Sequence, residues 1–524
     1  MHPQSPDVTA PARPSSVAPV SLRDVAVHVG AADQLTPGAS GRLKADPAVE
    51  MTGVAQSSRH VRPGDLYVAR SGGLTHGARY LSDAEAAGAS AWLTDRQGAS
   101  MAAGSALPML VVDDPQRWLG STAALVYGHP AEALTVIGVT GTQGKTTTTQ
   151  LIEVGLAGAG RRTAVIGTMG TRIAGRAVPS SLTTPEAPDL QALFAVMREQ
   201  GIDVCAMEVS SHALVSGRVD GVVFDLAAFT NFGRDHLDFH GSVEEYFAAK
   251  ASLFTTSRAN RGLVNSDDRE VARLLDGAEI TLTTYATGGG AADWRGTEIT
   301  TTHKGSSFVL SGPEGTRVDA AIALAGEFNV SNAVCALACI GEIGGDVAAA
   351  AEAISAISGV PGRMEPVDRG QAFAVIVDYA HKPDALSATL LALRKVTTGR
   401  LLLVIGAGGN RDQGKRPLMG EVAARTADVV VVSDDNPRSE EPATIRAQLM
   451  AGAVEAATGA ELHEIADREA AITFALGQAR GADTVLIAGK GHETGQDIGG
   501  TLHPFDDRTV AAAALERLAQ AGPT

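Results

Sequence analysis

The pattern of apolar and polar residues divides the chain into three successive α/β segments. Between residues 22 and 113, short strand-like runs such as LYVA (66–69) and MLVV (109–112) are separated by Gly-rich turns. From about Leu134, apolar runs alternate with helical stretches, which is the pattern of a parallel sheet. These runs are TVIGVTG (135–141), TAVIG (163–167), DVCAMEVS (203–210) and DLAAFTN (225–231).

The third segment follows a small-residue helix predicted within 328–345 and a connection containing Gly and Pro, SGVPGRME (358–365). Four apolar runs come next, and each leads into polar or Gly-rich residues and then a helical stretch. Ligands bind at the carboxyl ends of strands in open α/β sheets, so we expect a binding face here. The runs lie in FAVIVDYAHKPD (373–384), RLLLVIGAGGN (400–410), DVVVVSDDNPR (428–438) and TVLIAGKGHE (484–493).

These patterns predict an α/β protein of three domains, with a central parallel sheet like that of P-loop ATPases and a C-terminal Rossmann-like sheet. The length of 524 residues also exceeds what one hydrophobic core usually supports. The first residues carry five prolines and no apolar leader pattern, so we expect a disordered tail there. The predicted boundaries are a tail at 1–24 and domains at 25–113, 114–359 and 360–524.

Composition narrows the function. Hydrophobic residues make up 44% and charged residues 19% of the chain, which is typical of a globular protein. The formal net charge of -16 argues against non-specific binding of nucleic acid. The cysteines, Cys205, Cys335 and Cys339, lie in apolar stretches without metal-ligand spacing, and no apolar run is long enough for a membrane span. We therefore expect a soluble protein of the cytoplasm.

The segment VTGTQGKTTTTQL (139–151) predicts a phosphate-binding loop between a strand and a helix. Backbone N–H groups and the positive helix end bind the anion, Lys145 reaches the outer phosphates, and the Thr146 hydroxyl can ligate Mg²⁺. The segment departs from the strict P-loop pattern, because the position five before Gly144 is Val139. The alternative is a Gly-rich turn that only caps a helix. The loop alone leaves ATP hydrolysis, kinase chemistry and GTP switching open.

Two further clusters follow strands of the same segment. Glu208, near the end of a strand, can supply a carboxylate for Mg²⁺, although a buried ion pair is the alternative. TNFGRDHLDFHGS (230–242) concentrates Asp and His residues, including His236, which suits proton transfer or metal ligation. A polar helix cap would also explain that cluster. Lys250 reads from the residues alone as an exposed lysine of a helix that begins at Ser242.

The chain as a whole resembles the Mur ligase family. The resemblance rests on TGTQGKTTT, LTTPE, MEVSSHAL, TNFGRDHLDFHGS with YFAAK, GEFNVSNA, GRME and VDYAHKPD, in this order and spacing. It implies a domain for the UDP-muramoyl end of the substrate, a domain for ATP and a C-terminal domain for the incoming amino acid. Folylpolyglutamate synthetases share this plan and are the nearest rival.

The resemblance also implies roles for particular residues. Lys145, Glu208, His236 and Lys250 become catalytic, with ATP and Mg²⁺ as cofactors. Lys250 resembles the lysine that the family carbamylates, and a carbamate is an anionic oxygen ligand for Mg²⁺. The implied metal ligands are Thr146, Glu208, His236 and carbamylated Lys250. The implied ATP contacts are Gly141, Thr142, Gln143, Gly144, Lys145, Thr146, Thr147, Asn329, Arg363 and Asp378.

The UDP-muramoyl dipeptide is expected to span the first two domains. Arg218 suits a carboxylate or phosphate through its planar fork of donors. The implied contacts are Ser58, Gly73, Leu74, Thr75, Thr183, Thr184, Ser210, Ser216 and Arg218.

The DNPR segment (435–438) resembles the members of the family that add meso-diaminopimelate. Diaminopimelate differs from lysine by a carboxylate beside the far ammonium, so Arg438 is the expected discriminator and Glu493 can take the ammonium. Alone, the segment could be a Pro turn with surface charge. The implied contacts are Arg411, Asp435, Asn436, Pro437, Arg438, Gly489 and Glu493.

The implied reaction is ATP-dependent formation of an amide, through an acyl phosphate, between diaminopimelate and the D-Glu of UDP-N-acetylmuramoyl-L-Ala-D-Glu. Such an enzyme serves peptidoglycan synthesis, and so cell shape and division. We expect a monomer that can meet other cell-wall enzymes. Three alternatives stay open: a lysine-adding Mur ligase, a folate-extending ligase, and a P-loop switch or scaffold that binds nucleotide without ligation.

Overall fold

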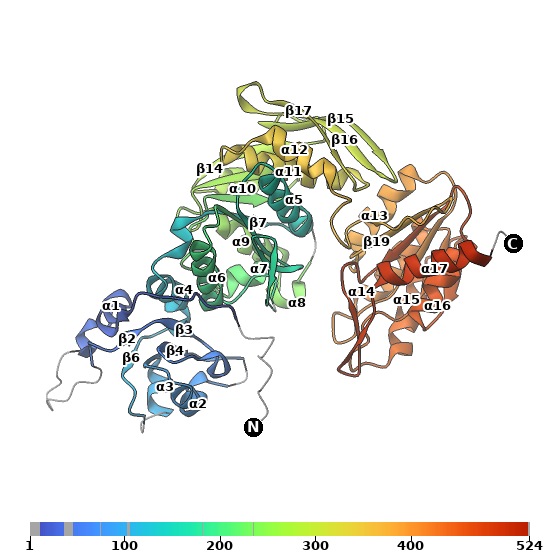
Figure 1. The fold of residues 1–524 in the computed structure, drawn as a ribbon. Coiled ribbons are helices and arrows are strands. Elements are labelled where there is room, and N and C mark those ends of the chain that lie inside the picture. Colours follow the sequence, from blue (N-terminus) through green and yellow to red (C-terminus); the bar gives the residue numbers. More distant parts are fainter. Residues whose placement is uncertain are drawn as a thin grey trace.

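The computed structural model describes residues 11–35, 46–73, 75–101, 105–180, 182–233 and 235–521. Residues 1–10 and Leu74, both part of the predictions above, lie outside these ranges. The chain builds α/β units in sequence order, and the central unit lies between the other two (Figure 1). The major sheets fall within the segments 25–113, 114–359 and 360–524.

The N-terminal unit is a parallel sheet in the order β3-β4-β5-β6. The strand-like runs at 66–69 and 109–112 form β4 and β6, as predicted. Helices α1 and α4 pack on one face of the sheet, and α2 covers the other. The elements are α1 (Leu22–His28), β3 (Gly53–Ala55), β4 (Asp65–Ala69), α2 (Leu81–Ala86), β5 (Ala91–Thr94), α3 (Arg96–Met101), β6 (Met109–Val111) and α4 (Pro115–Val126), with a small pair of β1 (Val20–Ser21) and β2 (Glu50–Met51).

The segment before α1 is ordered from residue 11, so the prediction of a disordered tail over 1–24 is wrong for residues 11–24. The Arg13 guanidinium is buried, pairs with Asp65 at 3.1 Å, and also contacts the Tyr127 hydroxyl. The Glu199 carboxylate accepts from the backbone N–H groups of Ser15 and Ser16, each at 3.0 Å. This segment therefore ties the first unit to the central one, which proline content alone does not reveal.

The central sheet is mixed rather than wholly parallel. Within the described residues, its strands follow the order β10-β9-β8-β11-β7-β12-β13-β14-β15-β16-β17. The run from β8 to β15 is parallel, as predicted, whereas β9 and β10 at one edge and β16 and β17 at the other are antiparallel. The strands are β7 (Thr135–Thr140), β8 (Thr163–Gly167), β9 (Gly170–Ile173), β10 (Arg176–Val178), β11 (Val204–Glu208), β12 (Leu226–Phe229), β13 (Arg261–Asn265), β14 (Thr281–Ala286), β15 (Trp294–Thr302), β16 (Gly305–Ser311) and β17 (Arg317–Ile322).

Both faces of the parallel part are covered by helices, which is why its strands are continuously apolar. Ile137 and Val139 of β7 join the core under α5, α11 and α12, whereas Val136 joins the opposite core under α6 and α9. Residues of a strand alternate between faces, so one apolar run serves both cores. The helices are α5 (Lys145–Gly158), α6 (Ala187–Glu199), α7 (Ser211–Val215), α8 (Leu237–His240), α9 (Val243–Ala251), α10 (Val271–Gly277), α11 (Glu327–Glu342) and α12 (Val347–Ala356).

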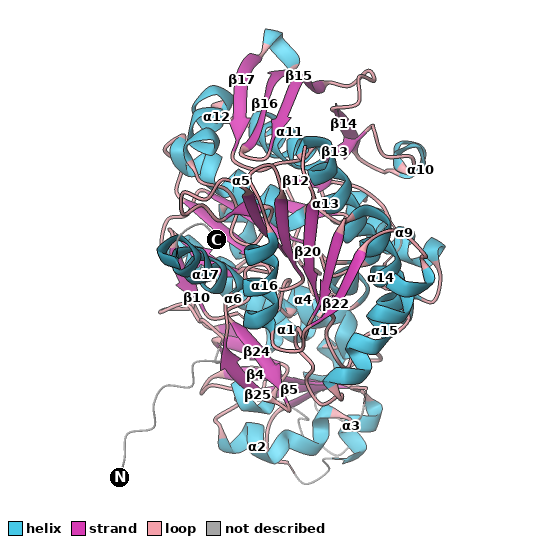
Figure 2. Cartoon of the chain, turned by 90° about the vertical axis from the view of Figure 1, so that its right-hand side faces the viewer, coloured by secondary structure: helices cyan, strands magenta, loops and turns pink. Residues whose placement is uncertain are grey.

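The C-terminal sheet follows the order β18-β19-β23-β20-β21-β22, and its strands from β19 onward are parallel. Figure 2 shows α16 and α17 on one side of this sheet and α14 and α15 on the other. The predicted strands are all present. The elements are β18 (Glu365–Pro366), β19 (Ala374–Asp378), α13 (Pro383–Val396), β20 (Leu401–Ile405), α14 (Lys415–Thr426), β21 (Val429–Val432), α15 (Pro442–Glu455), β22 (Glu461–Glu464), α16 (Arg468–Gln478), β23 (Thr484–Ala488), a hairpin of β24 (Gly495–Ile498) and β25 (Thr501–Pro504), and α17 (Asp507–Ala521).

Replacing Arg13 with Ala should destabilise the protein by about 3 kcal/mol, because Asp65 keeps a buried charge without its partner. Burial already raises the pKa of Asp65, and Arg13 opposes that rise. The deficit should therefore shrink as pH falls, since protonation removes the unpaired charge. Thermal unfolding at several pH values measures this. Arg96→Ala, which removes an exposed pair with Asp113, is the control and should be neutral. An equally neutral Arg13→Ala would contradict the prediction.

Candidate active site

The phosphate loop joins β7 to α5 and is shaped by two glycines with positive φ. Gly141 has φ 144° and Gly144 has φ 84°, values that L residues rarely adopt. A Cβ on Gly144 would lie 2.2 Å from Oδ1 of Asn332, a residue of α11. Helix α5 begins directly after Gly144, so the loop delivers its backbone to a helix N-terminus as the sequence predicts.

Two lysine amines converge on one carbonyl of this loop. Nζ of Lys145 donates to the Gly141 carbonyl at 2.8 Å, and Nζ of Lys250 donates to the same oxygen at 2.7 Å. Lys250 is 1% exposed, so the interpretation of an ordinary surface lysine is wrong. Burial lowers the pKa of Lys145 to about 8. Burial and the neighbouring Lys145 together hold the pKa of Lys250 well below its usual value.

Glu208 ends β11 beside the phosphate-loop strand and faces α5, as predicted. Its Oε1 accepts from the Thr146 hydroxyl at 2.9 Å and from the backbone N–H of Thr168 at 2.8 Å. Its main partners in the structure are thus neutral donors rather than a buried cation. Across the domain boundary, Nη2 of Arg363 donates to the Thr146 hydroxyl at 3.1 Å. The hydroxyl and the carboxylate form a pair of oxygen donors next to the phosphate loop.

His236 lies close enough to Lys145 to feel its charge, and it has a left-handed backbone at φ 49°. Its Nε2 is 3.2 Å from Oδ2 of Asp235, and the same carboxylate pairs with Lys382 from the C-terminal domain. Burial and the charge of Lys382 lower the pKa of His236 to about 3, so the imidazole is neutral at physiological pH. A neutral imidazole can ligate a metal or accept a proton.

The four residues implied as metal ligands fall into separate groups. Thr146 and Glu208 meet, and their oxygen donors suit Mg²⁺. His236 instead meets Asp235, and Lys250 meets the Gly141 carbonyl. Over the part of the chain that the structure describes, no group of three or more His, Cys, Asp or Glu side chains is placed to hold a metal. The residues present therefore fit one Mg²⁺ position at Thr146 and Glu208.

The remaining residues implied for ATP lie along the boundary between the central and C-terminal domains. The Asn329 amide, at the start of α11, donates to the Ala325 carbonyl at 2.9 Å and accepts from Asn332. The guanidinium of Arg363 stacks over the Tyr379 ring, 4.6 Å from its centroid. Asp378 is buried and accepts from the Met364 N–H at 2.8 Å, which fixes the chain directly after Arg363. These groups surround the start of α5 and can contact a nucleotide.

The residues implied for the dipeptide substrate form two clusters. At the carboxyl end of β11, the Thr184 hydroxyl donates to the Glu208 carbonyl at 2.8 Å and to Ser210, while Thr183 contacts Thr168. Thr168 in turn donates to the Glu208 carboxylate, so these hydroxyls gather around the residue that ends β11.

The second cluster surrounds a cavity of about 260 Å³ between the N-terminal and central domains. Ser216 and Arg218 line it with Arg70, Gln116 and Glu186, three residues that the sequence reasoning missed. Arg218 pairs with Glu186 at 3.0 Å. Ser58, Gly73 and Thr75 belong to the N-terminal domain: Ser58 begins a 3-10 turn, and the Thr75 carbonyl accepts from the Gly72 N–H.

The residues implied for the amino acid gather at the carboxyl ends of β20, β21 and β23. Oε2 of Glu493 accepts from the Asn436 amide at 2.8 Å. The buried ammonium of Lys490 lies 3.1 Å from Oδ1 of Asn436 and 3.3 Å from Oε2 of Glu493. The sequence reasoning missed Lys490, although its place between two glycines in AGKGHE was a usable signal. These contacts hold the Asn436 amide and the Glu493 carboxylate in place.

Both arginines implied for this pocket lie beside Gly408. A Cβ on Gly408 would be 2.9 Å from Nη1 of Arg438 and 3.9 Å from Cγ of Arg411. Arg438 has a left-handed backbone at φ 52° and donates to the Gly409 carbonyl at 2.7 Å. Gly489, with φ 118°, leaves room for the Asp435 carboxylate. The DNPR segment is thus a specific turn at a sheet edge rather than a free surface loop.

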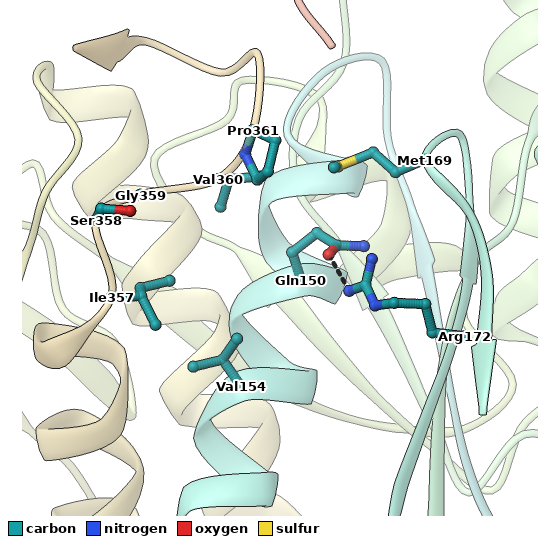
Figure 3. Close-up of a pocket in the computed structure, with 9 residues that line it drawn as sticks. All are labelled: Gln150, Val154, Met169, Arg172, Ile357, Ser358, Gly359, Val360 and Pro361. Carbon is teal, nitrogen blue, oxygen red and sulfur yellow. Dashed lines mark hydrogen bonds between the residues drawn. The ribbon is translucent and has the colours of Figure 1, made fainter. Parts of the chain in front are cut away.

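The connection between the central and C-terminal domains borders a cavity of about 320 Å³ (Figure 3). Residues 357–361 form one wall, and Gln150 and Val154 of α5 with Met169 and Arg172 form the others. Figure 3 shows the guanidinium of Arg172 turned toward the side-chain amide oxygen of Gln150, to which it donates. The cavity leaves open space beside the connection. None of the residues implied for the substrates lines it.

Comparison with known proteins defines the class. The Mur ligase middle domain matches residues 139–340, and the Mur ligase glutamate ligase domain matches residues 362–491. The chain belongs to the Mur ligase family. It is 49% identical over 510 residues, covering 97% of this chain and 98% of the relative, to the UDP-N-acetylmuramoyl-L-alanyl-D-glutamate--2,6-diaminopimelate ligase of Streptomyces avermitilis, and equally identical to that of Streptomyces coelicolor.

A solved structure of a ligase with the same name resembles the whole fold. It has a TM-score of 0.68 and 32% sequence identity, and the match covers 97% of this chain and 100% of that one. The predicted α/β fold of several domains is thereby confirmed.

Replacing Gly144 with Ala should weaken ATP binding at least about tenfold, because the new Cβ displaces Asn332 and strains a left-handed backbone. Titration with a fluorescent ATP analogue measures the affinity. Gly160→Ala is the matched control: its φ is 81°, but nothing lies within 4 Å of the new Cβ. It should cost about 1 kcal/mol of stability and leave the affinity unchanged. Equal affinities in both variants would contradict the steric argument.

Proposed function

We propose that this protein joins meso-diaminopimelate to the D-Glu γ-carboxylate of UDP-N-acetylmuramoyl-L-Ala-D-Glu at the expense of ATP. The observation that carries the proposal is the group of charged side chains around the DNPR turn. It offers the Arg438 guanidinium for a carboxylate and, about the same sheet edge, the Glu493 carboxylate for an ammonium. A zwitterionic end of an amino acid needs both charges. The two Streptomyces relatives carry this activity in their names.

The lysine-adding alternative is less favoured, because lysine would leave Arg438 without a carboxylate to bind. A folate-extending ligase is less favoured because full-length relatives at 49% identity are named for diaminopimelate. A nucleotide switch without ligation would not need the amino-acid pocket. Within the described residues, no helix is long and apolar enough to cross a membrane. We place the enzyme in the cytoplasm, where ATP is available and free cysteines such as the buried Cys205 stay reduced.

The reaction begins when the substrate's γ-carboxylate attacks the γ-phosphate of ATP, forming an acyl phosphate and releasing ADP. Lys145, at the start of α5, would stabilise the charge that spreads over the phosphate oxygens. Thr146 and Glu208 would hold Mg²⁺, which neutralises phosphate charge when bound. The Thr183, Thr184 and Ser210 hydroxyls lie beside Glu208 and would orient the carboxylate.

The amine of diaminopimelate then attacks the acyl carbon, and phosphate leaves as the amide forms. The C-terminal domain must bring its pocket to the phosphate loop for this step, and the Arg363 contact with Thr146 joins the two. Water must be excluded meanwhile, because hydrolysis of the acyl phosphate would waste ATP. The product is a UDP-muramoyl tripeptide for peptidoglycan synthesis, and hence for cell shape and division.

Lys250 has the environment that carbamylation requires. Its amine is buried beside Lys145, and this environment holds its pKa well below the usual value. The neutral amine is thereby favoured, and its lone pair can attack the carbon of CO₂ with loss of a proton. The resulting anion would remove the repulsion between the two lysines and face the cationic end of Lys145. We propose the carbamate as the working form of this residue.

Phosphate release tests the function directly. The reaction would contain ATP, Mg²⁺ and UDP-N-acetylmuramoyl-L-Ala-D-Glu, with meso-diaminopimelate, L-lysine or no amino acid in parallel. Release that depends on diaminopimelate is the expected result. A preference for lysine would overturn the role of Arg438, and release indifferent to both amino acids would overturn the ligase.

Replacing Arg438 with Lys should raise KM for diaminopimelate at least about tenfold, because the planar fork that matches a carboxylate is lost while the charge remains. KM for ATP should stay within about twofold. Arg446→Lys is the matched control in the same domain, since Arg446 pairs with Asp434 and Glu464 instead. Unchanged KM in Arg438→Lys would remove this residue from the pocket.

Carbonate chemistry gives a separate check on Lys250. Activity should fall when CO₂ is stripped from the buffer and return when bicarbonate is added, because carbamate formation is reversible. Lys250→Arg should be inactive under both conditions, since a guanidinium stays protonated and does not form a carbamate. Activity that is indifferent to bicarbonate, with no carbamate in the mass spectrum of the intact protein, would contradict this proposal.

A further inference from the structure

An ion pair joins the loop after β12 to the segment before α13, across the boundary between the central and C-terminal domains. Nζ of Lys382 donates to Oδ2 of Asp235. The same oxygen lies 3.2 Å from Nε2 of His236, and Oδ1 of Asp235 accepts from the His236 backbone N–H at 2.8 Å. One carboxylate therefore holds the ring and the backbone of His236 while it binds a cation from the other domain.

The segment that carries Lys382 is held firmly. Nδ1 of His381 lies 2.8 Å from the Tyr379 carbonyl, and the ammonium of Lys415 donates to the His381 carbonyl at 2.9 Å. Lys382 itself is the residue that precedes α13, so its backbone is fixed by a helix start. An ammonium that projects from such a segment moves with the whole C-terminal domain.

The pair is well shielded compared with a second ion pair that spans the same two domains. The side chains of Lys382 and Asp235 are 28% and 10% exposed, whereas those of Lys395 and Glu327 are 65% and 63% exposed. Shielding strengthens attraction between charges and weakens the effect of salt. The exposed pair, at the other end of α13, should contribute little. The two pairs thus form a natural comparison on a single helix.

Lys382 lies farther along the chain from the connection between the two domains than Arg363 does. Arg363, which also makes a cross-boundary contact at the active site, lies two residues after the connection at 357–361. Lys382 comes after β19, beyond the first strands of the C-terminal sheet. The cavity beside this connection leaves space for residues 357–361 to act as a hinge (Figure 3).

We propose that Lys382 is a positioning residue whose ion pair with Asp235 keeps the C-terminal domain closed over the phosphate loop and sets the orientation of His236. Lys382 acts through Asp235 and touches no reacting atom. Its effect on rate rests on the proposed ligase function, whereas its effect on closure does not. Loss of the pair leaves substrates able to bind but lowers the fraction of molecules that are closed and reactive.

A double-mutant cycle on the full-length protein tests this role. Lys382→Met should lower kcat about tenfold in the wild-type background and less than about twofold when Asp235 is already Asn, because the partner is then gone. KM for ATP should change less than about twofold in each variant. Lys382→Arg, which keeps the charge, should restore most of kcat. An equal loss in both backgrounds would overturn the proposal and indicate that Lys382 contacts the phosphates directly.

Small-angle X-ray scattering gives a readout that does not need the reaction. With Mg²⁺ and a non-hydrolysable ATP analogue present, Lys382→Met and Asp235→Asn should both have a larger radius of gyration than the wild type. Lys395→Met, which breaks the exposed pair on α13, should match the wild type in scattering and in kcat. A Lys382→Met variant with the radius of gyration of the wild type would overturn the proposed role of the ion pair in domain closure. A wild type without ligase activity would overturn the proposed function and leave the scattering comparison valid.

Discussion

Two lysine ammonium groups and one carbonyl oxygen create the constraint on which this active site depends. Lys145 and Lys250 both donate to the Gly141 carbonyl, and Lys250 is almost wholly buried there. Burial lowers the pKa of both amines, and the neighbouring Lys145 lowers that of Lys250 further. The site is therefore prepared for negative charge, whether from phosphates or from a carbamate on Lys250.

The surrounding structure supplies what this constraint requires. Glu208 and Thr146 place oxygen donors near the lysines, and Asp235 adds a second carboxylate. Thr146 belongs to α5 after β7, Glu208 ends β11, and Asp235 lies in the loop after β12; β11 and β12 are the two strands that flank β7 in the parallel sheet. Adjacent parallel strands bring their carboxyl ends to one edge, which explains why three loops far apart in sequence serve one site.

Closure of the site involves all three domains. Arg363 and Lys382 reach the central domain from the C-terminal side, and the segment around Arg13 fastens the N-terminal side. The N-terminal attachment is a buried ion pair with additional hydrogen bonds, whereas the connection to the C-terminal domain has open space beside it. Such a difference suits an enzyme that holds its nucleotide-linked substrate on a fixed platform and moves the amino-acid domain.

The sequence by itself determined the order of the strands along the chain, the phosphate loop, the position of Glu208 at a strand end and the DNPR turn. These features depend on local periodicity, on glycines and on short spacing, all of which are visible in a single chain. The sequence did not reveal the antiparallel edges of the central sheet or the docking of residues 11–24. Strand pairing and docking depend on distant partners, such as Asp65 for Arg13. Only the tertiary structure decided three further features: the burial of Lys250, the contact of Lys490 with Asn436 and the contact of Lys382 with Asp235. In each case an ordinary polar residue takes its role from a charge that lies close in space and far away in sequence.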